Sequence, residues 1–354
     1  MHPYITIVMP VRNEARFIRG TLTRLLEQDY PADRFEIIVA DGMSDDGTQA
    51  TVLELAESYP QIRLMENPRM LSSAGRNIGF ANGKGDYFLV VDGHCHIPDE
   101  KLLQNVADCF AKSGADCLGR PQPLDPPELS GFQEAVALAR GSKLGHGGDS
   151  LIYGDYEGFA SPVSNGAAYR REVFDKIGYV DEGFDACEDV EFNYRLEQAG
   201  LTCYSSPKLT IRYYPRENLR GLFRQMSRYG KGRRRFTRKH PPALSFNQLI
   251  PAVFVAGLSI LILSGIWSLV SGHWSLVTGQ LSIIFGLYFL LTIVESVRLV
   301  NENGWKYMPE LPPIFFAIHF GLGYGFIAEA VKVVFLAGNI AKPLKPSDMQ
   351  TSKY

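Results

Sequence analysis

The chain has 354 residues and a formal net charge of −2, which allows one large domain or two smaller ones. This near-neutral charge averages two unlike parts, because a mixed, charged sequence gives way to long apolar runs from Leu249 onward. Twelve Lys or Arg lie between Lys208 and Lys239, against a single acid, Glu217. Basic charge placed just before apolar runs favours lipid headgroups or phosphates as partners, and no nucleic-acid partner is expected.

The cysteines and the N-terminus bear on compartment and targeting. The five cysteines are scattered and have no C-x-x-C spacing, so they fit a reducing compartment and buried positions. The first ten residues hold a short apolar strand, and Arg12, Asn13 and Glu14 follow at once. Because there is no basic region before the strand and no cleavage site after it, no signal peptide is expected.

Short apolar runs alternate with helical patterns through the first ninety residues. The sequence predicts strands over 4–9, 35–40, 62–65 and 87–91. It predicts amphipathic helices after the first two strands, the first of them ending near Pro31. Strands that alternate with helices predict an α/β fold with a mostly parallel, Rossmann-like sheet.

Polar turns follow the first, second and fourth of these strands, at 12–14, 41–48 and 92–94. Each turn alone could serve only to reverse the chain, but the carboxyl ends of parallel strands share one edge, where ligands bind. Neither G-x-G-x-x-G nor G-x-x-x-x-G-K-[ST] is present, which disfavours a dinucleotide fold and a phosphate loop. The carboxylate and imidazole of Asp92 and His94 suit a divalent metal that would neutralise a diphosphate instead.

Five segments, taken in order, resemble the motif series of glycosyltransferase family 2: 8–14, 41–48, 75–77, 92–94 and 187–191. The resemblance implies the GT-A fold and inverting transfer from a nucleotide-diphosphate sugar. With its apolar C-terminal part, the chain is most similar to the succinoglycan-biosynthesis type of exopolysaccharide glycosyltransferase.

The resemblance implies a donor site and a metal. Residues that match the nucleotide and donor positions are Pro10, Arg12, Glu14, Asp41, Arg76 and Asp92. Asp92 and His94 stand where the family has its metal-binding Asp-x-Asp. Because imidazole suits Mn²⁺ better than Mg²⁺, the histidine favours Mn²⁺ as the cofactor.

The resemblance also implies a catalytic base and an acceptor site. Asp189 matches the acid that would deprotonate the acceptor hydroxyl in an inverting transfer. The alternative is that Asp189 and its acidic neighbours only stabilise the N-terminus of a helix. The residues assigned to the acceptor and diphosphate are Asn165, Gly166, Glu188, Gln225, Arg228 and Tyr229, the last three from an element similar to Q-x-x-R-W with Tyr for Trp. The glycine-rich run 141–159 reads as a flexible surface loop.

A basic helix precedes the apolar runs. Arginines recur every fourth residue from Arg212 to Arg228, and from about Glu217 the pattern predicts an amphipathic helix in the headgroup plane. A solvated basic face that only holds lipid is the alternative. The uncharged runs 249–270 and 276–294 are each long enough to cross a hydrocarbon core of about 30 Å, and the short connection between them predicts a helical hairpin. A third run, 311–328, contains two prolines and His319, so spanning and re-entry both stay open.

These features divide the chain into a GT-A catalytic domain (1–210), a basic amphipathic interfacial segment (211–245), a transmembrane region of two or three helices (246–340) and a tail (341–354). The arginines at 233–235 just before the first run predict a cytoplasmic catalytic domain on a multi-pass protein of the plasma (inner) membrane. Three spans would leave Lys342, Lys345 and Lys353 outside, against the positive-inside rule.

The predicted function is transfer of a sugar from a nucleotide-diphosphate sugar, with UDP-sugars favoured, to a lipid-linked sugar acceptor in exopolysaccharide or cell-envelope glycan synthesis. Direct transfer to polyprenyl phosphate, or to a carotenoid or another lipid, is the alternative within the same class. A catalytically inactive membrane scaffold is the alternative from a different class.

Overall fold

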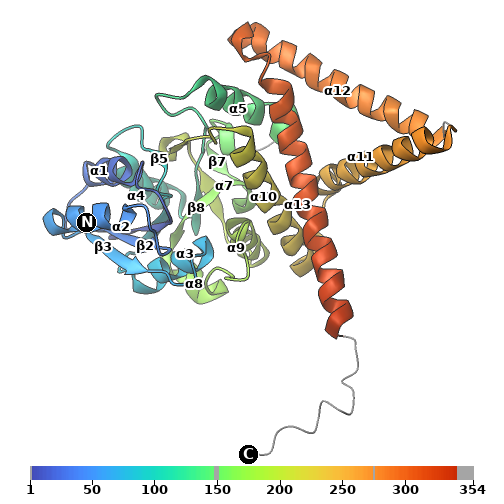
Figure 1. The fold of residues 1–354 in the computed structure, drawn as a ribbon. Helices are drawn as coiled ribbons and strands as arrows, with labels where there is room; N and C mark the ends of the chain where they lie inside the picture. Colours follow the sequence, from blue (N-terminus) through green and yellow to red (C-terminus); the bar gives the residue numbers. More distant parts are fainter. Residues whose placement is uncertain (1, 147–150, 274–275, 341–354) are drawn as a thin grey trace, which may run out of the picture.

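The computed structural model describes residues 2–146, 151–273 and 276–340. Its α/β part is built on an eight-stranded sheet of order β3-β2-β1-β4-β8-β6-β9-β7, with helices on both faces (Figure 1). The strands are β1 (Ile5–Val11), β2 (Phe35–Asp41), β3 (Ile62–Glu66), β4 (Tyr87–Val90), β6 (Cys117–Gly119), β7 (Gly158–Phe159), β8 (Gly166–Arg170) and β9 (Cys203–Ser205), and a separate pair joins β5 (Cys95–His96) to β10 (Arg212–Tyr213). The four strands expected near the N-terminus are therefore present and mutually parallel, as β1 to β4.

Alternating residues of β1 feed two separate cores, as expected for a strand buried on both faces. Ile5, Ile7 and Met9 pack with α1 (Ile18–Leu26), α2 (Thr48–Ser58) and α4 (Leu102–Ser113). Val8 packs on the other face with α3 (Ser72–Asn82), α8 (Arg171–Ile177) and α9 (Glu188–Gln198). The sheet is thereby sandwiched between two helical layers, which leaves its strand ends as the place for a site.

The three polar turns meet at one edge of the sheet, as predicted. Val11 lies opposite Asp41 in the β1–β2 register, and the turns are tied together by hydrogen bonds. The Asn13 N–H donates to Ser44 Oγ at 2.8 Å, and the Glu14 N–H donates to Thr48 Oγ1 at 2.8 Å. The turns thus form one continuous rim rather than three independent chain reversals.

The second half of the sheet departs from the expected pattern. β8 lies between β4 and β6 and is antiparallel to both. The run 141–159, expected to be a loop, contains α6 (Lys143–His146), η1 (Leu151–Tyr153) and β7, which pairs with β9; residues 147–150 lie outside the described residues. The loop expectation is wrong for 158–159, because their backbone groups complete the sheet edge beside Tyr204 and Ser205.

The predicted basic helix is present as α10 (Leu219–Lys239), but its surroundings differ from the prediction. Arg212 belongs to β10 and Arg216 precedes the helix, so the fourfold arginine series does not lie on one helix. The apolar side of α10, including Leu222 and Met226, is buried against α13 (Leu311–Ile340) and α5 (Gly131–Gly141). Other helices of the same chain therefore cover the apolar side of α10.

Glycines set the close approach of α10 and α13. A Cβ added to Gly325 would lie 2.0 Å from the Ser227 carbonyl oxygen, and one added to Gly230 would lie 2.1 Å from the Leu322 carbonyl oxygen. Gly323 faces the other way, toward α11 (Phe246–Ser271), where its Cβ would lie 1.9 Å from the Pro251 carbonyl oxygen. Small residues at such spacings let helix backbones approach closely, so α13 is held tightly between α10 and α11.

This packing predicts opposite effects for two Gly→Ala changes in the apolar helices. Gly325→Ala is expected to lower the free energy of unfolding by about 1–3 kcal/mol, because the methyl group meets backbone. Gly286→Ala is the matched control, since nothing lies within 4 Å of its added Cβ, and it is expected to be neutral or to stabilise by up to about 1 kcal/mol through helix propensity. Thermal unfolding of the detergent-solubilised chain measures both. Equal effects of the two changes would contradict the close contact.

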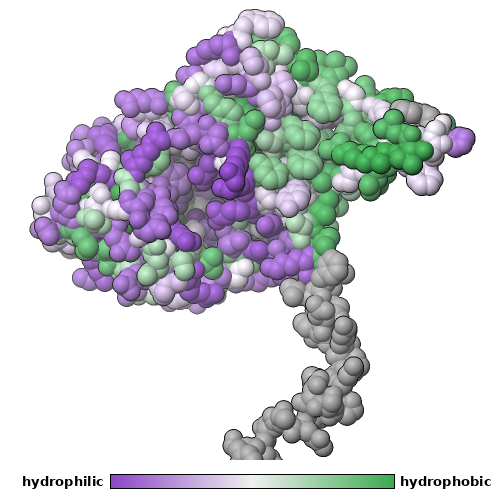
Figure 2. All heavy atoms as spheres, in the orientation of Figure 1, coloured by the Kyte–Doolittle hydropathy of each residue, from purple (hydrophilic) through white to green (hydrophobic). Residues whose placement is uncertain are grey.

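The remaining apolar helices project away from the α/β part. α11 and α12 (Leu276–Asn303) leave the neighbourhood of α13 and approach each other at their far ends, as the predicted hairpin (Figure 1). Space-filling colouring shows mostly polar surface over the α/β part and a continuous apolar surface over these helices (Figure 2). Composition and length make α11, α12 and α13 all candidate membrane spans.

Candidate functional site

A cavity of about 1500 Å³ opens at the carboxyl edge of the parallel strands, and the hollow is visible between the α/β part and the apolar helices (Figure 2). It exceeds the usual volume of a small-ligand site, about 300–1,000 Å³. The residues predicted for the site that line it are Pro10, Arg12, Glu14, Arg76, Asp92, His94, Asn165, Gly166, Glu188, Asp189, Gln225, Arg228 and Tyr229. The fold thus brings together, in one space, residues separated by more than two hundred positions in the chain.

Asp41 is the predicted site residue that does not line this cavity. Its carboxylate is buried and accepts hydrogen bonds from the Ser44 N–H at 2.9 Å, from Ser44 Oγ at 2.5 Å and from Gln49 Nε2 at 2.5 Å. These bonds shape the turn that follows β2. For Asp41 to contact the donor nucleotide, as predicted, the nucleotide would have to enter this hydrogen-bonded group.

Asp92 and His94 lie on the rim formed by the strand ends. His94 Nδ1 lies 2.8 Å from Glu14 Oε1, and the imidazole ring is flanked by Phe17 and Tyr213, with ring centroids 6.5 and 6.1 Å away. Burial lowers the pKa of His94, but the Glu14 carboxylate and then Asp92 outweigh it, so that its pKa lies above the usual value. With Nδ1 engaged by Glu14, the ring presents Nε2 as its second nitrogen.

The Asp92 carboxylate makes no hydrogen bond or ion pair within the described ranges. It is partly exposed to the cavity, and no set of three His, Cys, Asp or Glu residues suited to a metal occurs among the residues that the structure describes. The protein therefore offers a two-residue donor set, Asp92 with Nε2 of His94. Such a set fits a divalent ion that takes its other ligands from diphosphate oxygens and water.

A buried arginine, Arg76, lies among acids of the cavity lining. Its side chain is 11 % exposed and its Nη2 lies 3.4 Å from Glu188 Oε1. Burial lowers the pKa of Arg76, but Glu188, Asp189 and Asp92 outweigh this and raise it, so the guanidinium stays charged. Burial is also the main cause that raises the pKa of Glu188, with Arg76 opposing it. One fixed cation thus neutralises part of a cluster of three carboxylates.

The close packing of α3 on β1 sets the position of Arg76. A Cβ added to Gly75 would lie 2.9 Å from Pro10 Cβ, and one added to Gly79 would lie 2.3 Å from Val8 Cγ1. These glycines therefore let the helix approach the strand closely. The motif at 75–77 consequently places a cation beside the polar rim at 12–14.

Asp189 lies in the first turn of α9 and is partly exposed to the cavity. Its Oδ1 accepts a hydrogen bond from the Val190 N–H at 2.8 Å. The residue before the helix, Cys187, has φ of 60°, and its thiol donates to the Tyr229 carbonyl oxygen at 3.7 Å. The turn that carries Asp189 is therefore held against α10, where Gly232 allows the approach: its Cβ would lie 2.4 Å from the Ala186 carbonyl oxygen.

The residues predicted for the acceptor and diphosphate occupy two walls. Asn165 is buried, its Nδ2 donates to Ser205 Oγ at 3.0 Å, and its Oδ1 has no hydrogen-bond partner. On α10, Gln225 Nε2 donates to the Tyr229 hydroxyl at 3.3 Å, and Arg228 Nη2 donates to the Asp185 carbonyl oxygen at 2.7 Å. Side chains from α10 therefore reach the same cavity as the strand-end residues.

Further lining residues were not foreseen from the sequence. Arg140 in the last turn of α5 is only 9 % exposed and, in the part of the chain that the structure describes, has no hydrogen bond or ion pair. It opposes the burial that raises the pKa of Tyr229. Ala243 and Gln248, at the root of α11, also line the cavity. An arginine in an otherwise apolar helical pattern, Ala135 to Ala139, was the signal available for Arg140.

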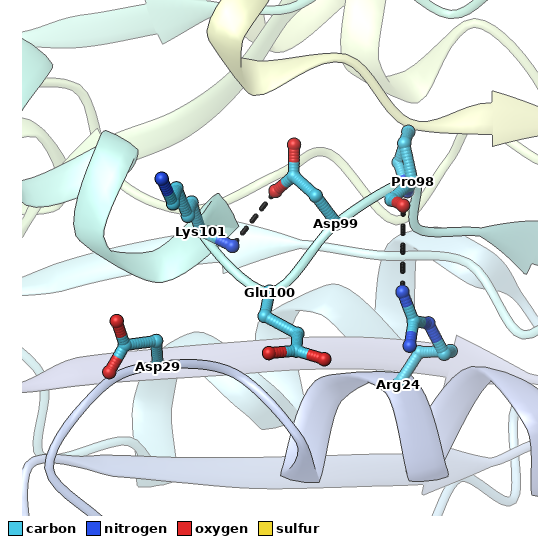
Figure 3. Close-up of a pocket in the computed structure, with 6 residues that line it drawn as sticks. All are labelled: Arg24, Asp29, Pro98, Asp99, Glu100 and Lys101. Carbon is cyan, nitrogen blue, oxygen red and sulfur yellow. Dashed lines mark hydrogen bonds between the residues drawn. The ribbon is translucent and has the colours of Figure 1, made fainter.

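A second, smaller hollow of about 360 Å³ lies at the start of α4 and contains none of the predicted site residues. Arg24, Pro98, Asp99 and Lys101 form its rim (Figure 3), where the Lys101 N–H donates to Asp99 Oδ1 at 2.8 Å. Arg24 Nη2 of α1 donates to the Pro98 carbonyl oxygen at 3.5 Å, so both bonds hold the loop in place. The chemistry therefore belongs to the larger cavity.

Comparison with known proteins identifies the family. The glycosyl transferase family 2 model matches residues 6–178, and that of glycosyl transferase family group 2 matches residues 144–327. The succinoglycan biosynthesis protein ExoA of Rhizobium meliloti is 35 % identical over 247 residues, which cover 69 % of this chain and 73 % of that protein. The chain belongs to glycosyltransferase family 2.

Two further similarities extend over nearly the whole chain. A dolichyl N-acetyl-alpha-D-glucosaminyl phosphate 3-beta-D-2,3-diacetamido-2,3-dideoxy-beta-D-glucuronosyltransferase of Methanococcus voltae is 25 % identical over 342 residues, covering 93 % of this chain and 98 % of that protein. The mannosyltransferase PcManGT of Pyrobaculum calidifontis, solved with GDP-Man and Mn²⁺, has a TM-score of 0.62 at 18 % identity and covers 95 % of this chain and 88 % of that one. The expected GT-A fold with a C-terminal helical region is confirmed.

As a family 2 glycosyltransferase, the chain is an enzyme that acts on nucleotide sugars, with relatives in polysaccharide and lipid-linked glycan synthesis. The inactive-scaffold alternative is therefore set aside.

The family 2 glycosyltransferase also contains a buried carboxylate, Glu191, whose three cationic partners help to fix α9. Glu191 has no exposed side-chain surface and contacts Arg195 Nε at 3.1 Å, Lys239 Nζ at 2.7 Å and His240 Nε2 at 3.0 Å. Burial raises the pKa of Glu191, but the bonds from Lys239 and His240 outweigh it and hold the pKa below 4.5. The last acid of the 187–191 motif thus joins α9 to the end of α10.

Glu191→Gln is expected to lower the free energy of unfolding by about 1.5–3 kcal/mol at pH 7, because Arg195, Lys239 and His240 lose the buried charge that they contact. Since the folded-state pKa is depressed, this stabilisation is complete above pH 4.5 and is lost as pH falls through the folded-state value. Denaturation of wild type and variant between pH 7 and 3 measures it, with exposed Glu197→Gln on the same helix as control. A difference that did not shrink below pH 4.5 would contradict the assignment.

Proposed function

We propose that this enzyme is a membrane-bound inverting glycosyltransferase that uses a nucleotide-diphosphate sugar, with a UDP-sugar favoured, and a lipid-linked sugar as acceptor. Its place would be exopolysaccharide or cell-envelope glycan synthesis at the plasma membrane, with the catalytic domain cytoplasmic. One observation carries the proposal: a single cavity is lined by Asp92 and His94 at the strand ends, by Asp189, and by Ala243 and Gln248 at the root of the apolar helix α11.

The donor half of the reaction uses the strand-end residues. Asp92 and Nε2 of His94 would hold a divalent ion, with Mn²⁺ favoured because one donor is an imidazole. When bound, the ion offsets the negative charge of the departing diphosphate. Glu14 contacts Nδ1 of His94, and so orients the imidazole and fixes its tautomer. Buried Arg76 supplies a permanent positive charge beside Asp92.

The acceptor half uses Asp189. Its carboxylate takes the proton of the acceptor hydroxyl as that oxygen attacks the anomeric carbon, on the side opposite the leaving diphosphate. The bond of Oδ1 to its own helix leaves Oδ2 as the accepting oxygen. Gln225, Arg228 and Tyr229 from α10 line the same space and position the acceptor.

The phosphate of the lipid carrier has a candidate partner in Arg140, whose charge is buried in the cavity without an acidic partner among the described residues. Arg140→Gln is expected to raise KM for the lipid acceptor at least tenfold, as for loss of a charge-assisted hydrogen bond of about 1.5–3 kcal/mol, with donor affinity unchanged. Arg34→Gln, at the opposite end of the strands, is the control. A fall in donor affinity with unchanged acceptor KM would remove Arg140 from the acceptor site.

The experiment that tests the function uses the full chain in detergent. Donor binding is screened by thermal shift with UDP-, GDP- and dTDP-sugars in Mn²⁺, and the stabilising donor is then supplied with a crude lipid extract. The proposal expects a radiolabelled sugar in the lipid phase and inverted anomeric configuration. Transfer only to water-soluble glycans, or retention of configuration, would overturn it. Labelling of free polyprenyl phosphate or of a carotenoid instead would select the alternative acceptor.

A further inference from the structure

The third apolar helix, α13, is packed differently from the other two. In the most apolar 18-residue stretch of each helix, 6 % of residues are buried inside the protein in α11, 28 % in α12 and 44 % in α13. By composition all three could cross a membrane. The hairpin of α11 and α12 is therefore mostly exposed, whereas nearly half of the apolar stretch of α13 is buried.

The start of α13 is fixed to the catalytic domain. Leu311, Ile314 and Phe315 are fully buried in a cluster with α5 and α10. Just before it, Lys306 Nζ and the Tyr307 hydroxyl contact Glu134 Oε2 on α5 at 3.0 and 2.8 Å. The chain therefore returns to the catalytic domain at the end of α12.

The far part of α13 is fixed to the same domain. Arg235 of α10 makes two hydrogen bonds to the Glu329 carboxylate, at 2.9 and 3.1 Å. The same guanidinium also contacts Asp185, four residues before Asp189. Between the two ends, Gly321 and Gly325 lie against Met226 and Ser227 of α10, so contact with α10 is maintained along the helix.

These attachments are incompatible with a membrane-spanning position of α13. Leu311 and Glu329 are 18 residues apart, about 27 Å along a helix, which is close to the full hydrocarbon thickness of about 30 Å. If α13 crossed the bilayer, α10 beside it would be carried into the hydrocarbon with its exposed Arg220, Arg224 and Arg228. Charged side chains in that position are strongly unfavourable.

The hairpin has the opposite arrangement. Its two roots both lie on the catalytic side, since Gln248 near the start of α11 lines the cavity and Lys306 after α12 contacts Glu134. The surface of the hairpin is mostly apolar where α11 and α12 project from the α/β part (Figure 2). α11 and α12 diverge from α13 and converge at a distant tip near Gly272 (Figure 1).

We propose that the chain crosses the bilayer twice, through α11 and α12, and that α13 lies along the membrane surface against the catalytic domain. This inference rests on the membrane location proposed above. Tyr324 on α13 is exposed, as suits a helix at headgroup level, where tyrosine is enriched. Lys342, Lys345 and Lys353 then stay on the catalytic side, in agreement with the positive-inside rule.

Single added cysteines test the proposal in intact cells with a membrane-impermeant maleimide, with wild type giving the background from native cysteines. His273→Cys reports the hairpin tip, Ser352→Cys the C-terminus and Ala50→Cys the exposed surface of α2. Only variants that retain transferase activity are scored. The proposal expects His273→Cys to be labelled in intact cells, and Ser352→Cys and Ala50→Cys only after permeabilisation.

Labelling of Ser352→Cys on the same side as His273→Cys would overturn the two-span arrangement. Labelling of Ala50→Cys and Ser352→Cys in intact cells, with His273→Cys protected, would support two spans while overturning the cytoplasmic location. Release of the protein by alkaline carbonate without detergent would overturn the membrane location and, with it, this topology.

Discussion

Asp189→Asn is expected to lower kcat by about 10²- to 10⁴-fold, the usual contribution of a general base, while donor binding stays nearly unchanged. The amide is the same size as the carboxylate, and its oxygen can still accept the Val190 N–H that Oδ1 accepts at 2.8 Å. The helix turn is therefore expected to keep its shape while the proton acceptor is lost. Steady-state kinetics and donor titration by thermal shift measure the two effects separately.

Glu188→Gln is the informative comparison for Asp189→Asn. Glu188 is the carboxylate in contact with Arg76, at 3.4 Å, so its loss removes the nearest counter-charge of a buried guanidinium and leaves Asp189 and Asp92 as the other acids near it. We expect Glu188→Gln to lower stability and donor affinity together. If Asp189→Asn behaved in the same way, with weak donor binding and little specific loss of kcat, its role would be to support the helix N-terminus, and the base would lie elsewhere.

Asp92→Asn is expected to abolish the response of the enzyme to divalent metal and to lower transfer by at least about 10²-fold, because the two-residue donor set loses its only anion. In wild type, excess chelator is expected to remove activity, and Mn²⁺ is expected to restore it. In the variant, neither addition should change the residual rate. Full wild-type activity in chelator would overturn the metal assignment while leaving Asp189 untouched.

Glu14→Gln provides a graded control for Asp92→Asn. Glu14 touches His94 Nδ1 at 2.8 Å and would not bind the ion directly. Loss of such a supporting group usually costs about 10- to 100-fold in metal affinity, so saturating Mn²⁺ should restore most activity. Donor affinity that stayed low at saturating metal would instead support the nucleoside contact predicted for Glu14.

The local features of the catalytic domain could be predicted because they depend on short stretches of sequence. The strands ending at Val11, Asp41 and Val90 are apolar runs that break at a polar turn, and parallel pairing then brings those turns to one edge. Asp92 and His94 follow from position in this pattern, whereas Asp189 was predicted only from the resemblance to glycosyltransferase family 2. What could not be predicted is the antiparallel insertion of β8, since strand order depends on contacts between residues far apart in the chain.

The surroundings of the apolar helices could not be predicted for a different reason. A helix surface that packs on another helix and one that faces lipid have the same composition, so Leu311 to Ala328 reads as a possible span in either case. Arg140 was missed because a lone arginine on an apolar helix is usually solvated, and only the meeting of α5 with η1 and α10 buries it.

The cover that α13 provides for α10 bears on how the enzyme can be produced. A fragment that ends at residue 245 would contain every predicted donor and catalytic residue, yet it would leave Leu222 and Met226 without the side chains that bury them. Such a fragment is expected to aggregate or to require detergent although it lacks the hairpin. A water-soluble form is better sought by removing α11 and α12 and joining α10 directly to α13.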